Sequence, residues 1–208
     1  MVNAQEICQV ESVYHGSSRS GLRVILPVVS THGKPLVYAC KDTIMAALFL
    51  SGRGGDLTCQ LGRDRATSRP YLCERFAGAA EYRYAATRGS IYTLPGESFR
   101  AGQTSWDEEV VSAVKVRPTA ESMIEDVMRH LEQLQAHDLL RIYRYPARPR
   151  GVPQDDEDLV MRGVVWTRER GEAILEQFRS YHPHLLERIE QGLADGRYAD
   201  EFHGDRGP

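Results

Sequence analysis

Short apolar segments occupy the first two thirds of the chain, and most have the length and residue types of β-strands. The apolar run at residues 21–29 predicts a strand that Pro27 restricts to a sheet edge or a bend. Residues 51–69 are rich in Gly, Arg and Asp and are expected to form a surface loop. The other strands are expected at residues 36–40, 80–85, 90–94, 110–116 and 139–145.

Helical spacing is clearest at residues 119–136, where six apolar side chains recur three or four positions apart. A shorter helix is expected at residues 43–50, with Asp42 in the N-cap position. Proline-rich residues 146–153 and an acidic run indicate a linker or an exposed loop. A short strand at 160–166, a helix at 167–181 and a helix from Pro183 follow it. We therefore expect one domain over residues 1–152 and a helical extension over 153–208.

The composition is that of a globular protein and narrows the classes of partner. The chain has 208 residues, of which 41% are hydrophobic and 26% charged, and its formal net charge is −3. Nucleic acid is thus a less favoured partner, because no global basic field is present. The four cysteines form no C-x-x-C pair, which argues against zinc and for free thiols in the cytoplasm. The longest apolar run, residues 44–50, is too short to span a membrane.

Three separated motifs carry the candidate chemistry. Tyr14-His15-Gly16-Ser17 precedes the first strong strand, Val37-Tyr38-Ala39 leads into a helix, and Glu108-Glu109 opens a late strand. In this order they resemble the H-Y-E branch of the ADP-ribosyltransferase superfamily, which includes diphtheria toxin and the poly(ADP-ribose) polymerases. The layout is also similar to the compact rifamycin ADP-ribosyltransferases, and the resemblance covers roughly residues 13–150. It implies an α+β fold whose split antiparallel β-sheet core forms an NAD cleft, with helices packed outside.

The resemblance implies that NAD is the substrate and that no metal is needed. Breaking the bond between nicotinamide and ribose creates a flat, electron-poor centre like that of glycoside hydrolysis. By resemblance, His15 binds a ribose hydroxyl, the Gly16 backbone binds the carboxamide, and Ser17 adds one hydrogen bond to it. The glycine can do so because it has no side chain to hold the ligand away.

The remaining roles implied by the resemblance are stacking and charge stabilisation. Tyr38 and Phe49 offer aromatic faces to the nicotinamide ring. Glu109 holds the 2′-hydroxyl of the nicotinamide ribose and favours the cationic centre. Glu108 and Glu97 stay open as alternatives, although adjacent strand residues point to opposite faces, so Glu108 and Glu109 cannot both line one cleft.

These motifs lead to an expected activity and two alternatives. The expected activity is mono-ADP-ribosyl transfer to a protein, a nucleic acid or a small molecule. An RNA 2′-phosphotransferase-like enzyme, which also consumes NAD, is supported by Arg19, Arg23 and the basic residues 141–150. A non-catalytic NAD, ADP-ribose or protein-binding module is supported by Ala46, which stands where the polymerase branch has a serine. Trp106 lies just before the candidate carboxylates Glu108 and Glu109. It is a candidate for lining an acceptor site, but a buried core position is the simpler interpretation.

Overall fold

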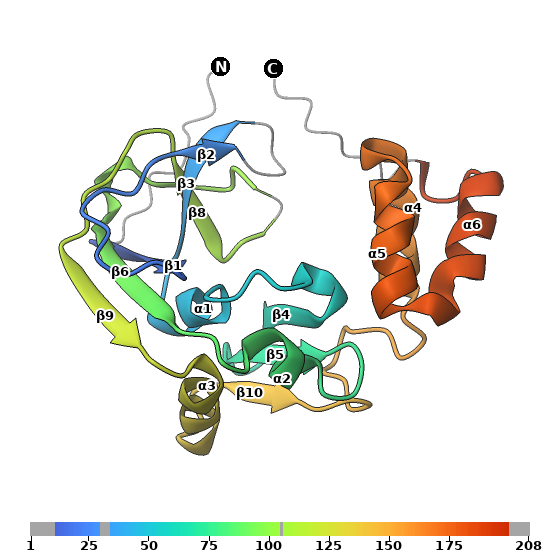
Figure 1. Ribbon diagram of the computed structural model, residues 1–208, viewed down its shortest axis with the longest axis horizontal. Helices are drawn as coiled ribbons and strands as arrows, with labels where there is room; N and C mark the ends of the chain where they lie inside the picture. Colours follow the sequence, from blue (N-terminus) through green and yellow to red (C-terminus); the bar gives the residue numbers. More distant parts are fainter. Residues whose placement is uncertain (1–10, 30–33, 105, 200–208) are drawn as a thin grey trace. The chain divides into compact units, whose positions relative to one another are not determined.

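A mostly antiparallel sheet organises the first part of this α+β protein (Figure 1). The computed structural model describes residues 11–29, 34–104 and 106–199, so Cys8 lies outside the described residues. Two compact units are formed. The first comprises Met1–Arg53, Leu61–Leu72 and Ala80–Ile142, and the second comprises Gly54–Gln60, Cys73–Ala79 and Tyr143–Pro208.

The larger sheet has the strand order β7-β8-β3-β1-β6-β9, and β2 pairs with β3. Its strands are β1 (Ser12–Ser17), β2 (Val28–Val29), β3 (Pro35–Cys40), β6 (Gly89–Pro95), β7 (Arg100–Ala101), β8 (Glu109–Ser112) and β9 (Ala120–Ile124). A three-stranded sheet has the order β10-β5-β4, formed by β10 (Arg141–Tyr143), β5 (Pro70–Glu74) and β4 (Cys59–Arg63). The helices of the first unit include α1 (Thr43–Leu48) and α3 (Val127–Ala136).

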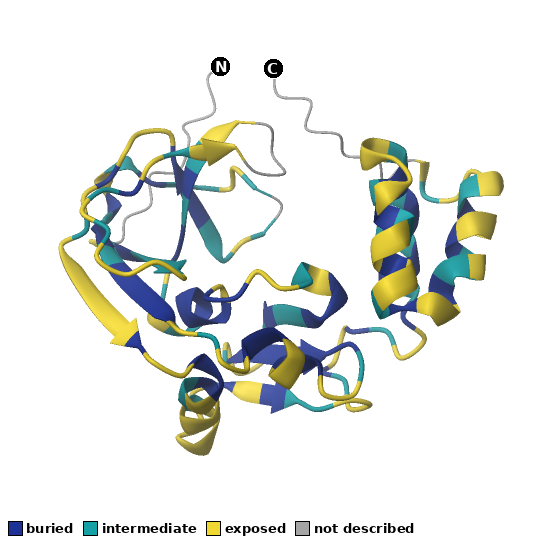
Figure 2. Cartoon of the chain, viewed as in Figure 1, coloured by how far each residue is buried: buried dark blue, intermediate teal, exposed yellow. Residues whose placement is uncertain are grey.

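One face of the larger sheet carries the apolar core of the first unit. Side chains alternate between the two faces of a strand, so every second residue points into this core. Its members are completely or almost completely buried (Figure 2). They are Val13, Ile25, Val37, Ala39, Tyr92, Leu94, Phe99, Val110 and Val116.

The second unit packs three helices around its own core. These helices are α4 (Glu157–Arg170), α5 (Ala173–Tyr181) and α6 (Leu186–Ala194), with a 3-10 turn, η3 (Pro183–Leu185), before α6. Their shared core contains Leu57, Leu159, Val160, Val164, Ile174, Phe178, Leu185 and Ile189. No helix among the described residues is both long enough and apolar enough to cross a membrane.

Several predicted elements were wrong, and tertiary pairing explains the main one. The segment predicted as one helix over 119–136 forms strand β9, then a turn, then helix α3. Ala120–Ile124 pairs along β6, so sheet formation overrides the helical spacing of its apolar residues. Asp126 then caps α3 by accepting a hydrogen bond from the Arg129 N–H at 3.0 Å.

The other differences are local. The predicted strand at 80–85 is helix α2 (Ala79–Tyr84), and the predicted strand at 160–166 lies inside α4. The loop expected at 51–69 contains β4 and a 3-10 turn, η1 (Gly55–Leu57). Three predicted strands are shorter: 110–116 is represented by β8, 139–145 by β10, and 21–29 by β2 and an isolated bridge between Ile25 and Val116. A further 3-10 turn, η2 (Gly96–Ser98), follows β6 directly.

His182 is a buried titratable group in the second unit. Its side chain is completely buried, and its Nε2–H donates to the Leu57 carbonyl at 2.6 Å. Nδ1 has no hydrogen-bond partner among the described residues. Burial lowers the pKa of His182 below its ordinary value of 6.5, while Asp156 opposes the shift and His184 and Arg75 add to it. The folded state therefore holds this imidazole neutral.

We expect the free energy of unfolding to fall as the pH drops below about 6.5. The unfolded chain binds a proton on this imidazole that the folded chain resists, so acid favours unfolding, by up to about 1.4 kcal/mol per pH unit for one group. Urea unfolding from about pH 8 to about pH 5 measures this slope. His182→Asn should make the slope shallower, and the buried imidazoles of His15 and His130, whose pKa values are also lowered, account for the slope that remains. An identical slope in His182→Asn and wild type would contradict the assignment.

Candidate active site

The three candidate catalytic residues lie on three adjacent strands of the larger sheet. His15 is on β1, Tyr38 on the neighbouring β3, and Glu109 at the start of β8, which pairs with β3. The register sets Tyr14 opposite Cys40 and Cys40 opposite Glu109. The fold thus brings together three motifs that are far apart in the sequence.

His15 is joined to β3 by a hydrogen bond. Its Nδ1–H donates to the Tyr38 carbonyl at 2.7 Å, since a carbonyl can only accept. Burial lowers the pKa of His15 below 6.5, although the bond to Tyr38 opposes this shift. The neutral ring therefore carries its proton on Nδ1 and presents Nε2 as an acceptor, for which the described residues provide no partner. A ligand hydroxyl is a suitable donor to this atom.

The side chains do not all leave the sheet on the same side. Directly opposed residues of antiparallel strands point to one face, so Tyr38 and Glu109 share a face with Cys40. His15 alternates to the other face, where Tyr92 is its partner on β6, with ring centroids 6.5 Å apart. Tyr38 and Glu109 therefore lie on the same face of the sheet. His15 lies on the opposite face and contacts Tyr38 through the Tyr38 backbone carbonyl.

Glu108 is held by an arginine that the sequence did not single out. Arg63 on β4 donates from Nε and Nη2 to the two carboxylate oxygens of Glu108, at 2.8 and 2.7 Å. Its Nη2 also donates to Asp42 at 2.5 Å. These hydrogen bonds, those to Glu108 first, raise the pKa of Arg63. Because Arg63 lies in a segment with the composition of a loop, only the folded structure reveals this bidentate pair.

The carboxylates around β3 also affect the protonation state of the Cys40 thiol. Burial raises the pKa of Cys40, and Glu109, Asp42 and Glu108 raise it further, against a smaller opposing effect of Arg63. The thiol therefore stays protonated and is a poor nucleophile. Cys40, Cys59 and Cys73 are buried and are not disulfide-bonded. Glu97, the third candidate carboxylate, is exposed on η2.

Residues of the first motif and of α1 complete the site. Gly16 has a structural role, because a Cβ there would lie 2.3 Å from the Ala46 carbonyl oxygen of α1. Ser17 Oγ accepts a hydrogen bond from the Arg19 N–H at 3.1 Å. Phe49, which ends α1, is 39% exposed, and its ring meets that of Trp106 edge-on with centroids 5.2 Å apart. An aromatic pair thus lies next to the strand that carries Glu109.

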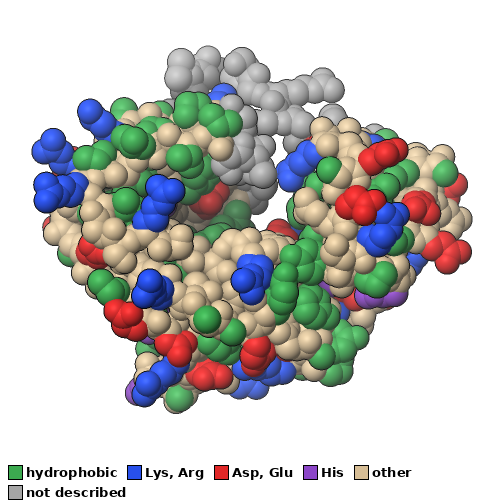
Figure 3. Space-filling model, in the orientation of Figure 1, with side chains coloured by type: hydrophobic (Ala, Val, Ile, Leu, Met, Phe, Trp, Pro, Cys, Tyr) green, Lys and Arg blue, Asp and Glu red, His purple; other side chains and the backbone are tan. Residues whose placement is uncertain are grey.

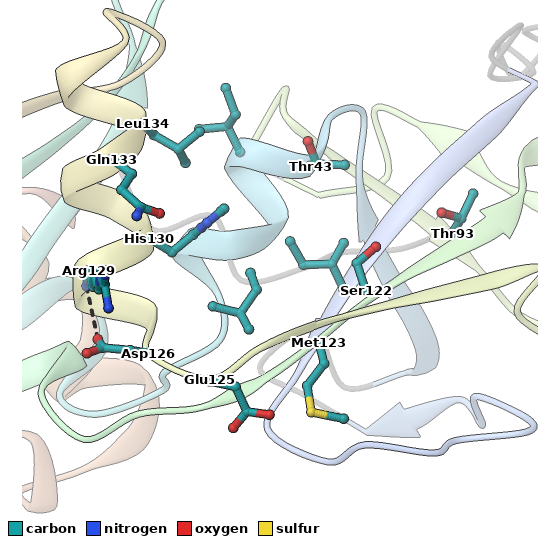
Figure 4. A pocket seen from close by; sticks show the side chains of 13 residues that line it. Thr43, Thr93, Ser122, Met123, Glu125, Asp126, Arg129, His130, Gln133 and Leu134 are labelled. Atoms are coloured by element: carbon teal, nitrogen blue, oxygen red, sulfur yellow. Dashed lines mark hydrogen bonds between the residues drawn. The ribbon is translucent and has the colours of Figure 1, made fainter.

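A cavity of about 560 Å³ lies elsewhere in the first unit, and none of the candidate residues lines it (Figure 4).

Side chains of both charge signs are spread over the visible surface, with no extended basic stripe (Figure 3). Among the described residues, no group of three or more His, Cys, Asp or Glu is arranged to hold a metal ion. No protein-family model, curated protein or solved structure matches the chain.

Proposed function

We propose that the chain is an NAD-dependent mono-ADP-ribosyltransferase with an ADP-ribosyltransferase-like split-sheet core. The observation that carries the proposal is the His15–Tyr38 hydrogen bond between adjacent strands, together with Glu109 on the next strand. Register pairs between β1 and β6 run over six positions, whereas a single pair is described between β1 and β3. The His15 imidazole donates its hydrogen bond to the Tyr38 carbonyl of β3 next to that single pair. Such a side-chain bond is expected where two strands begin to separate.

The proposed reaction breaks the bond between C1′ of the ribose and the nicotinamide nitrogen. The bonding electron pair leaves with nicotinamide, and C1′ becomes electron-poor. Glu109 binds the 2′-hydroxyl and stabilises this charge through its carboxylate. The nucleophile of the acceptor then bonds to C1′ and loses its proton to a carboxylate or to water. We assign the catalytic role to Glu109 rather than to its neighbour because Glu109 leaves the sheet on the face that Tyr38 shares.

His15 leaves the sheet on the face opposite Tyr38 and Glu109, so in this proposal it contacts a different part of NAD, which contains two riboses. Tyr38 offers its ring to nicotinamide on the face that Glu109 shares. His15 accepts from a ribose hydroxyl through Nε2, and this ribose need not be the one that Glu109 binds. Phe49, beside Trp106, adds a partly exposed aromatic surface for nicotinamide or for the acceptor. The acceptor is a protein, a nucleic acid or a small molecule.

A nicotinamide-release assay with NAD labelled in its nicotinamide ring, and cell lysate as acceptor, tests the proposal. We expect release by the wild type and roughly tenfold slower release by His15→Ala, the effect of losing about one hydrogen bond in the transition state. His137→Ala is the matched control, since its Nδ1 also bonds to a backbone carbonyl, that of Gln133, but at an exposed helix end. No release by the wild type, or equal loss in both variants, would contradict the proposal.

A further inference from the structure

The first unit contains a cavity that none of the candidate NAD-site residues line. We propose that the cavity between β6, β9, α1 and α3 binds a neutral planar heterocycle of the nucleobase class, presented as a nucleoside. This inference does not depend on the proposed transferase activity. It rests on the cavity of about 560 Å³ and on the side chains that line it (Figure 4). A volume of this order is typical of small-molecule sites.

The interior of the cavity is aliphatic on two opposing sides. Ile91 and Ile124 come from the sheet, and Ile44 and Leu134 come from α1 and α3. Ile91 lies opposite Ser122 and Ile124 opposite Gly89, so these side chains share the face that lines the cavity. Branched aliphatic side chains from a sheet and from helices form walls against which a flat ring can pack.

The rim adds uncharged hydrogen-bonding groups with no partners of their own. The side chains of Thr93, Ser122, His130 and Gln133 line the cavity, and none of them has a hydrogen-bond partner among the residues that the structure describes. Burial lowers the pKa of His130. Its imidazole is therefore neutral at pH 7 and has one donor and one acceptor. The edge of a nucleobase likewise combines donors and acceptors in one plane.

The charged groups of the cavity favour a nucleoside over a nucleotide. Glu125, Asp126 and Arg129 line one end, and Asp126 already accepts from the Arg129 backbone N–H. Two carboxylates and one guanidinium leave this end with a net negative charge, which repels a phosphate. Ribose hydroxyls, in contrast, can donate to a carboxylate such as Glu125.

Titration of the full chain with adenosine, guanosine, cytidine and uridine, followed by NMR or calorimetry, tests the inference. We expect at least one nucleoside to bind and its 5′-monophosphate to bind more weakly. Ser122→Phe places a ring in the cavity from an exposed strand position and should abolish binding. Ala113→Phe adds the same ring at an exposed position outside the cavity and should leave binding unchanged.

A second variant tests the hydrogen-bonding rim without filling the cavity. Gln133→Leu keeps the size of an exposed side chain on α3 but removes its amide, and should weaken binding about tenfold, as one lost hydrogen bond does. His15→Ala should leave nucleoside binding unchanged, which separates this cavity from the proposed NAD site. A single-stranded oligonucleotide that binds with the same sensitivity to Ser122→Phe would support the ligand class and identify its source as a nucleic-acid end.

Three results would overturn the inference. The first is that no nucleoside binds at millimolar concentration. The second is that binding is unchanged in both Ser122→Phe and Gln133→Leu, or is lost in His15→Ala. The third is that an aliphatic alcohol of similar size binds as tightly as the best nucleoside, since the cavity would then recognise apolar volume and not a planar hydrogen-bonding ring.

Discussion

Replacing Glu109 by Gln is expected to reduce nicotinamide release about 10³-fold while the protein stays folded. The amide keeps the size of the side chain and can still hydrogen-bond the 2′-hydroxyl, but it lacks the negative charge that stabilises an electron-poor C1′. Glu109 is only half-buried, so the fold is expected to tolerate the isosteric replacement. Release of labelled nicotinamide measures the rate, and a thermal unfolding curve shows that the fold is retained.

Glu108→Gln is the matched control because it makes the same chemical change one residue away. This variant loses the charge that pairs with Arg63, and because the Arg63 and Glu108 side chains are only 26% and 17% exposed, we expect about 1–3 kcal/mol of lost stability. Nicotinamide release should stay within a few fold of wild type. A large loss of release in Glu108→Gln, with Glu109→Gln fully active, would move the catalytic role to Glu108.

Replacing Gly16 by Ala is expected to destabilise the protein by about 3 kcal/mol. The added Cβ would lie 2.3 Å from the Ala46 carbonyl oxygen and 3.3 Å from its carbon. A backbone carbonyl inside α1 cannot turn away as a flexible side chain can, so the helix and β1 must separate. Urea unfolding measures the loss.

Gly52→Ala is the control for this second prediction. Its Cβ would meet nothing within 4 Å, and its backbone does not have a positive φ. We therefore expect its unfolding free energy to lie within about 0.5 kcal/mol of wild type. A Gly16→Ala protein as stable as Gly52→Ala would contradict the close packing of α1 against β1.

Local signals in the sequence were sufficient for α1 and for the strands around it. Asp42 was expected to cap a helix, and its Oδ1 accepts from the Ile44 and Met45 N–H groups at 2.9 Å. The strand predicted at 36–40 is confirmed as β3, and the strand predicted at 90–94 as β6. These elements are defined by short-range features, namely a capping side chain and runs of buried residues between turns.

Long-range features could not be predicted in the same way. Ala120–Ile124 carries apolar residues that suit a helix, and only pairing with β6 makes it a strand. Nothing near Arg63 in the sequence indicates that it binds Glu108. The order of the motifs suggested that His15, Tyr38 and Glu109 meet; they lie on adjacent strands, but the His15 side chain leaves the face opposite Tyr38 and Glu109. The face on which each side chain leaves the sheet depends on the register, which no local pattern specifies.

The most direct test of the proposed NAD site is a crystal structure of the Glu109→Gln protein grown with NAD. We expect intact NAD with its nicotinamide ring against Tyr38, its 2′-hydroxyl within hydrogen-bonding distance of the introduced amide, and a ribose hydroxyl donating to His15 Nε2. NAD bound away from β1, β3 and β8, with none of these contacts, would contradict the proposal.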